Sequence, residues 1–221
     1  MKSFVLGKTR GGLTIPAHSF GNRGPRVLLL GGVHGDEPEG VALAMELWGK
    51  YAGIFPHRLQ LILIPVLNRD GLLARSRGNG AGVDLNRNLP TKDWKPTAPT
   101  PRYHPGRAPN SESENLALTA LIESFRPVFI ISFHSFHRYM VNVNGDCRRE
   151  AELISEITGY PVYEDMGYPT PGSLGTYAGQ ERDIPTITYE LKKGAKLGPL
   201  LPLHIKAVDA CLQLIGRTRS S

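Results

Sequence analysis

The sequence has few cysteines, no long apolar run and no cluster of basic and aromatic residues. Its two cysteines, Cys147 and Cys211, lack C-x-x-C spacing, which indicates free thiols in a reducing compartment. No apolar stretch approaches the ~20 residues that cross a bilayer. Residues 1–21 lack the apolar core of a secretory signal. We therefore expect a cytoplasmic protein with no membrane partner.

The charge of the chain is positive but dispersed. Lys and Arg exceed Asp and Glu by 26 to 20, a formal net charge of +6. The basic residues are spread along the chain and match no nucleic-acid-binding motif, so we expect no nucleic-acid partner. A positive cleft for a small anionic substrate fits the same charge. The 221 residues, 40% of them hydrophobic, suit one domain over residues 1–221, and the oligomeric state stays open.

Strand and helix patterns alternate along the chain. The runs 26–32, 59–67 and 128–133 are almost continuously apolar, which is typical of strands covered on both faces. This alternation predicts an α/β fold with a mixed, mostly parallel sheet flanked by helices. Short extended segments are expected over 3–23, further strands over 138–143 and 185–191, and helices over 40–50, 111–125, 149–158 and 200–215.

Three stretches are expected to be loops. Residues 68–90 are polar and glycine-rich, and residues 162–179 carry several Gly and Pro. Residues 94–109 (WKPTAPTPRYHPGRAP) contain too much proline for a long regular element, so we expect an exposed loop or a lid there.

Histidine and glutamate side chains follow several predicted strands. His34 and Glu37 come after the first apolar run in LLLGGVHGDE, His134 comes after VFIISF, and Glu190 lies near the end of PTITYEL. Ligand sites in open α/β sheets gather at the carboxyl ends of strands. Two imidazoles and a carboxylate suit a catalytic zinc, which takes three protein ligands and keeps one position open. Glu190 is then available as a base.

The order of the motifs HGDE, NRDGLLARSR, GVDLNRN, SFHS and TYEL resembles the zinc carboxypeptidase family. These motifs span about residues 28–191. Within the family, the bacterial murein peptide amidases, which cleave the γ-D-glutamyl–diaminopimelate bond, are most similar. The resemblance implies a zinc-carboxypeptidase-like fold, one Zn²⁺ per chain and a small murein peptide as substrate.

The resemblance also implies roles for single residues. His34, Glu37 and His134 match the three zinc ligands, and Glu190 matches the general base. Taken singly, Glu37 could instead be a helix N-terminal charge and Glu190 a salt-bridge partner of a following lysine.

Further matched positions concern the substrate. Arg77 matches the arginine that polarises the scissile carbonyl, with Arg75 as a fallback. Asn86 and Arg87 match the pair that binds a substrate carboxylate, a role that suits the planar fork of a guanidinium. Tyr168 lies near the position of a mobile tyrosine that covers the substrate in extracellular relatives.

Other polar residues are expected to serve the structure. Asp84 is predicted to hold a loop or a ligand imidazole. His137 is expected not to be a ligand, and His104 is expected on the surface. Phe136 stands where extracellular carboxypeptidases often have tyrosine.

Two alternative functions remain open at this point. One is an acyl-amino-acid hydrolase of the succinylglutamate desuccinylase and aspartoacylase type, which shares part of the motif pattern. The other is a non-catalytic module that binds zinc or cell-wall peptide. The presence of His34, Glu37, His134 and Glu190 together favours an enzyme.

Overall fold

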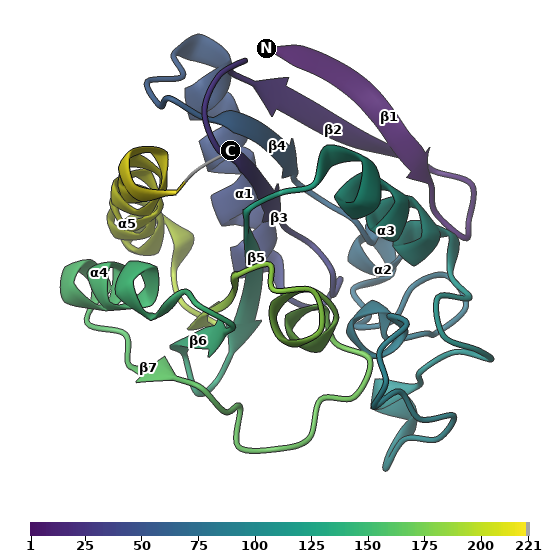
Figure 1. Cartoon of the computed structure of the whole chain (residues 1–221). Coiled ribbons are helices and arrows are strands. Elements are labelled where there is room, and N and C mark those ends of the chain that lie inside the picture. The colour runs from purple at the N-terminus through teal and green to yellow at the C-terminus, as the bar shows by residue number, and fades with distance from the viewer. Residues whose placement is uncertain (220–221) are drawn as a thin grey trace.

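A mixed β-sheet runs through the molecule with helices on both faces (Figure 1). The computed structural model describes residues 1–219, and within them the sheet has eight strands in the order β1-β2-β4-β3-β5-β8-β6-β7. Strands β3, β4, β5 and β8 pair in parallel, as do β6 and β7, while the remaining pairings are antiparallel. The strands are β1 Lys2–Lys8, β2 Thr14–Phe20, β3 Arg26–Leu30, β4 Gln60–Ile64, β5 Phe129–Phe136, β6 Met140–Asn144, β7 Val162–Tyr163 and β8 Thr186–Lys192. The predicted mixed, mostly parallel sheet is confirmed.

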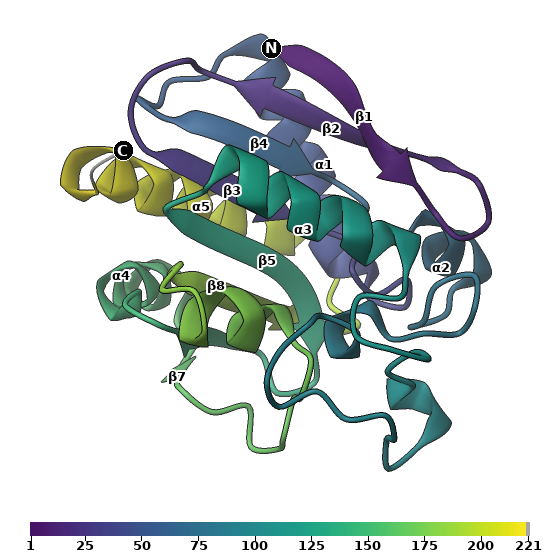
Figure 2. The same ribbon diagram turned by 45° about the vertical axis from the view of Figure 1, so that its right-hand side comes forward.

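The helices divide between the two faces of the sheet (Figure 2). Helices α1 (Pro38–Gly53), α4 (Arg148–Thr158) and α5 (Leu197–Thr218) pack together on one face. Helix α3 (Ser113–Phe125) covers the other face. Proline at the first position of α1 suits a helix start, because that N–H would have no helical partner in any case.

Strand β3 shows why the central strands read as continuous apolar runs. Val27 and Leu29 point into the core beneath α1 and α5, whereas Leu28 and Leu30 point into the core beneath α3. All four are fully buried, because side chains alternate along a strand and both faces are covered.

Short helical turns were not predicted from the sequence. Helix α2 (Arg69–Ala74) and a π-helical turn (Gly175–Gln180) lie in stretches expected to be loops. Both are six residues long and glycine-containing, so neither carries a periodic apolar pattern. Helix α2 begins instead at a local cap, in which the Asn68 side chain accepts a hydrogen bond from the Gly71 N–H (2.8 Å).

In the part of the chain that the structure describes, no helix is both long and apolar enough to span a membrane.

Acid is expected to destabilise the fold through His204 on α5. This imidazole is 1% exposed and contacts the Tyr189 hydroxyl, and burial lowers its pKa to about 4. The unfolded chain binds a proton near pH 6.5, so stability is lost as pH falls from about 6.5 to 4, by at most about 3 kcal/mol. Urea midpoints of the wild type and His204→Leu across this range measure the effect. If the urea midpoint of His204→Leu falls with pH as steeply as that of the wild type, the prediction is wrong.

Candidate active site

Parallel strands bring the candidate residues to one edge of the sheet. The loop after β3 carries His34 and Glu37, and His134 lies near the end of β5. Glu190 on β8 is the direct register partner of His134 on β5. The candidate base and a candidate ligand are therefore neighbours on adjacent strands. A Cβ at Gly35 would lie 1.9 Å from the Gly71 backbone, so only glycine lets the loop after β3 pack against α2.

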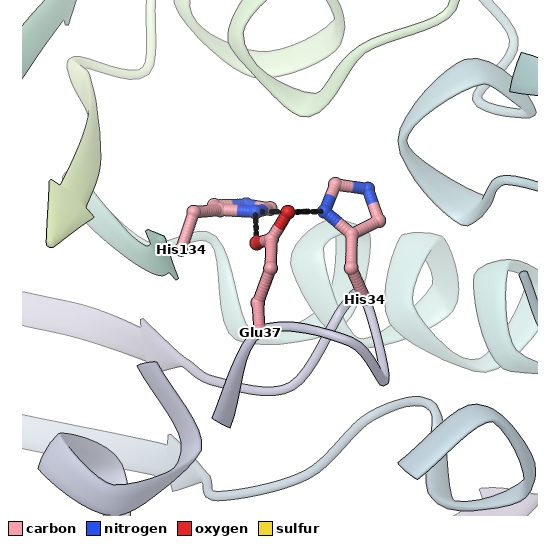
Figure 3. A group of neighbouring side chains, drawn as sticks. All are labelled: His34, Glu37 and His134. Atoms are coloured by element: carbon pink, nitrogen blue, oxygen red, sulfur yellow. Dashed lines mark hydrogen bonds and ion pairs between the residues drawn. The ribbon is translucent and has the colours of Figure 1, made fainter. Parts of the chain in front are cut away.

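His34, Glu37 and His134 form a tight buried group (Figure 3). Their donor atoms all lie within 4.8 Å of one another. One Glu37 oxygen is 2.9 Å from His34 Nδ1 and the other is 2.9 Å from His134 Nδ1. The two Nδ1 atoms are 3.1 Å apart. The side chains thus point their donor atoms at a common centre.

The outer nitrogens of both imidazoles are held by neighbours. Asp84 Oδ1 lies 3.1 Å from His34 Nε2, and Ser132 Oγ lies 2.9 Å from His134 Nε2. A carboxylate only accepts hydrogen bonds, so Asp84 can take the proton of His34 Nε2; Nδ1, which faces the Glu37 carboxylate in this structure, would then offer its lone pair to a metal. Such outer partners orient metal-binding histidines. Two imidazole nitrogens and a carboxylate in this arrangement fit a zinc ion.

Asp84 is charged in spite of its full burial. Burial alone would raise its pKa, but the His34 imidazole and the Arg77 guanidinium outweigh that effect and hold the pKa well below its usual range. Arg77 donates from Nε to Asp84 Oδ2 (2.8 Å) and from Nη1 to Glu37 Oε1 (3.1 Å). Two of the five guanidinium N–H groups are used in these bonds, so others remain for a substrate.

The buried carboxyl group of Glu190 lines one cavity together with His34, Glu37 and Arg77. It is 6% exposed, and its Oε2 atom has no hydrogen-bond partner within residues 1–219. Burial raises its pKa to about 7; the His134 imidazole opposes this rise, and the Glu37 carboxylate adds to it. A carboxyl group with a raised pKa and a free oxygen is suited to accept and return a proton near neutral pH.

Asn86 and Arg87 lie at the wall of the cavity with part of their hydrogen-bonding capacity already used. The Asn86 side-chain oxygen accepts from the Leu174 N–H (2.8 Å), so its NH₂ group is the end left for a ligand. Arg87 donates from Nη1 to the Asn86 carbonyl oxygen (2.6 Å) and is 5% exposed. This pair can bind a carboxylate.

The remaining predicted residues fall into two groups. Tyr168 lines the cavity, with its ring 6.2 Å from that of Phe136. His137 also lines the cavity, but it is exposed and lies outside the buried metal-type group. Within the described chain, Arg75 is exposed and does not line the cavity, and His104 is also exposed.

The cavity, with a volume of about 610 Å³, contains polar residues that we did not single out from the sequence. Asn142 and Asn144 on β6 point into it, whereas Val141 and Val143 between them point into the core. The alternation in MVNVN is a signal that identifies them in retrospect. Lys193, Arg102 and Tyr103 also line it.

Comparison with known proteins identifies the family. A family model described as zinc carboxypeptidase matches residues 1–190. The chain belongs to the zinc carboxypeptidase family. It is accordingly a hydrolase of the metallopeptidase type, and the resemblance drawn from the motifs is confirmed.

Relatives of this zinc carboxypeptidase include murein peptide amidases. It is 34% identical over 202 residues to murein peptide amidase A of Vibrio campbellii, covering 85% of this chain and 77% of the relative. It is 31% identical over 176 residues to the Escherichia coli K12 protein of that name, covering 74% and 69%. The crystal structure of murein-tripeptide amidase from Escherichia coli O157 superimposes with a TM-score of 0.79 at 23% identity, covering 100% of this chain and 94% of that one. The predicted zinc-carboxypeptidase-like fold is confirmed.

Proposed function

We propose that this zinc carboxypeptidase is a zinc-dependent amidase that hydrolyses the γ-D-glutamyl–diaminopimelate bond of free murein peptides in the cytoplasm. The observation that carries the proposal is one cavity lined by His34, Glu37, the buried Glu190 and the guanidinium groups of Arg77 and Arg87, with His134 Nδ1 2.9 Å from the Glu37 carboxylate. The names of the relatives support the substrate class.

The metal group is proposed to hold one Zn²⁺ per chain. The donor set of His34, Glu37 and His134 fits it, because both imidazoles present Nδ1 to the centre and have their Nε2 atoms anchored. When bound, zinc supplies a Lewis acid and lowers the pKa of water.

The protein's own residues then divide the chemistry. Glu190 accepts a proton from the attacking water at its free Oε2 and returns it to the leaving amine. Arg77 donates N–H groups to the oxygen that becomes negative when the amide carbonyl is attacked. Asp84 and Glu37 hold that guanidinium in place.

Other residues of the cavity bind the part of the substrate that is released by hydrolysis. Arg87 and the Asn86 NH₂ group bind the carboxylate of the residue that leaves. Asn144 donates from Nδ2 to Asn142 Oδ1 and to the Thr186 carbonyl, so its side-chain oxygen is the group left for a polar side chain such as that of diaminopimelate. Tyr168 forms part of the wall over the bound peptide.

Substrate comparison tests this function. We expect hydrolysis of L-Ala-γ-D-Glu-meso-diaminopimelate to exceed that of N-succinylglutamate by at least ~100-fold in kcat/KM, about 3 kcal/mol of differential transition-state binding. Preference for N-succinylglutamate would instead establish an acyl-amino-acid hydrolase. Binding of zinc and peptide with no hydrolysis of either would establish a binding module.

Arg87→Ala is expected to weaken productive binding of the substrate carboxylate. Removing one partner of a buried charge pair costs about 2–4 kcal/mol, so kcat/KM should fall about 30- to 1,000-fold. The tripeptide whose leaving residue carries a carboxamide at the same position is the matched control, and it should lose far less. Equal losses for both substrates would show that Arg87 does not bind that carboxylate.

A further inference from the structure

The largely exposed proline-rich segment 94–109 reaches the cavity at one turn. Arg102 and Tyr103, in the turn Pro101–Tyr103, both line the cavity. The carbonyl oxygen of His104 accepts a hydrogen bond from the Asp84 N–H (2.8 Å). The segment is thereby attached to the residue that orients both His34 and Arg77.

Tyr103 lies beside Arg77 and Arg87, which line the cavity with it. Its ring centroid is 5.2 Å from the guanidinium carbon of Arg77 and 5.4 Å from that of Arg87. Both distances are within the ~6 Å range of cation–π attraction. Since two guanidinium groups repel each other, an aromatic ring that contacts both lowers the cost of keeping them in one cavity.

Arg102 ties the same turn to the opposite side of the cavity. Its Nη2 donates to Asp36 Oδ2 (2.7 Å), one residue before Glu37, and Lys193 Nζ lies 3.4 Å from the same oxygen. The Arg102 side chain is 47% exposed, so this pair adds little stability by itself. Its effect is to restrict where the turn lies, and Pro99, Pro101 and Pro105 restrict the backbone further.

We propose that Tyr103 is a positioning residue. It holds the guanidinium groups of Arg77 and Arg87 at the separation between the scissile carbonyl and the leaving residue's carboxylate in one bound substrate. This inference rests on the proposed function for its kinetic consequence. Arg77 is also held by two carboxylates, whereas Arg87 donates to a backbone carbonyl. Loss of the ring therefore releases Arg87 more than Arg77.

The kinetic test is the preference for a free carboxylate on the leaving residue. We define it as kcat/KM for the tripeptide divided by kcat/KM for its carboxamide analogue. Tyr103→Ala should lower this ratio about 10-fold, the scale of one desolvated cation–π contact. Tyr103→Phe keeps the ring and should restore the ratio. Arg107→Ala, an exposed arginine of the same segment, is the matched control and should leave it unchanged.

A second readout does not depend on turnover. Guanidinium groups that the ring holds in place should give Nε–H signals with high ¹⁵N order parameters. In zinc-loaded protein, Tyr103→Ala should lower the order parameter of the Arg87 Nε–H, and less that of the Arg77 Nε–H, whereas Tyr103→Phe and Arg107→Ala should leave both unchanged. If Tyr103→Ala is poorly recovered, Tyr103→Leu keeps apolar volume without the ring and serves the same comparison.

The outcomes separate the inference from the proposed function. A lower ratio together with a lower Arg87 order parameter supports the positioning role. A ratio within twofold of wild type in Tyr103→Ala overturns it. If wild-type enzyme hydrolyses neither peptide, the proposed function fails, and the order parameters decide the inference alone: a lower Arg87 value in Tyr103→Ala supports it, and an unchanged value overturns it.

Discussion

Glu190→Gln should reduce kcat by about 10²–10⁴-fold, the range attributed to a positioned acid–base group. The amide has nearly the shape of the carboxyl group but cannot accept the proton that Glu190 is proposed to take from water. The site around it is already built, with Glu190 in register with His134 and its Oε2 atom free. Single-turnover hydrolysis of the tripeptide, measured beside zinc content, separates a lost base from a lost metal.

The control for this substitution is Glu156→Gln. Glu156 is an exposed glutamate on α4 and does not line the cavity, so the Glu156→Gln variant should be as active as the wild type. Near-wild-type turnover in zinc-loaded Glu190→Gln would rule out the mechanism proposed here. Loss of zinc from Glu190→Gln would also count against it, because it would make Glu190 a ligand.

Removal of zinc by a chelator should lower hydrolysis to background, and one equivalent of zinc per chain should restore it. The physical reason is that the buried group of His34, Glu37 and His134 is arranged for a cation at its centre. Zinc at 1,000 times its Kd adds about 4 kcal/mol to folding stability. For a chain of this size, that corresponds to a rise in Tm of about 10 °C.

A pair of histidine variants makes the metal prediction specific. His134→Ala removes a ligand and should abolish both reactivation and the rise in Tm. His137→Ala removes an exposed imidazole of the same cavity and should retain both. Hydrolysis that persists without metal, or equal behaviour of the two variants, would show that the buried group is not the zinc site.

The central strands and the family could be predicted because their signals are local. Leu28–Leu30 and Ile62–Ile64 are apolar on both faces of the sheet, so the sequence alone marks them as buried strands. Each motif that indicates the family, such as HGDE or TYEL, is a short contiguous segment that a single strand and its following loop can present.

The contacts of the proline-rich segment 94–109 could not be predicted from local signals. Its composition correctly excludes a long regular element, since only the short turn Pro101–Tyr103 forms in the described segment, and His104 is exposed as expected. Its role depends on contacts with distant residues: Arg102 meets Asp36, and Tyr103 meets Arg77 and Arg87. Composition carries no information about which residues a loop will touch.

The sequence by itself determined which side chains were available for metal binding and proton transfer, and which strands would carry them. Tertiary structure decided how they meet. Two imidazoles a hundred positions apart converge because β3 and β5 are parallel neighbours, and Glu190 joins them because β8 pairs with β5. The unpartnered carboxylate oxygen of Glu190 and the contact of Asp84 with His34 Nε2 are properties of the folded site. Local residue patterns specify strands and loops, whereas the chemistry of this cavity depends on distances that only the assembled sheet sets.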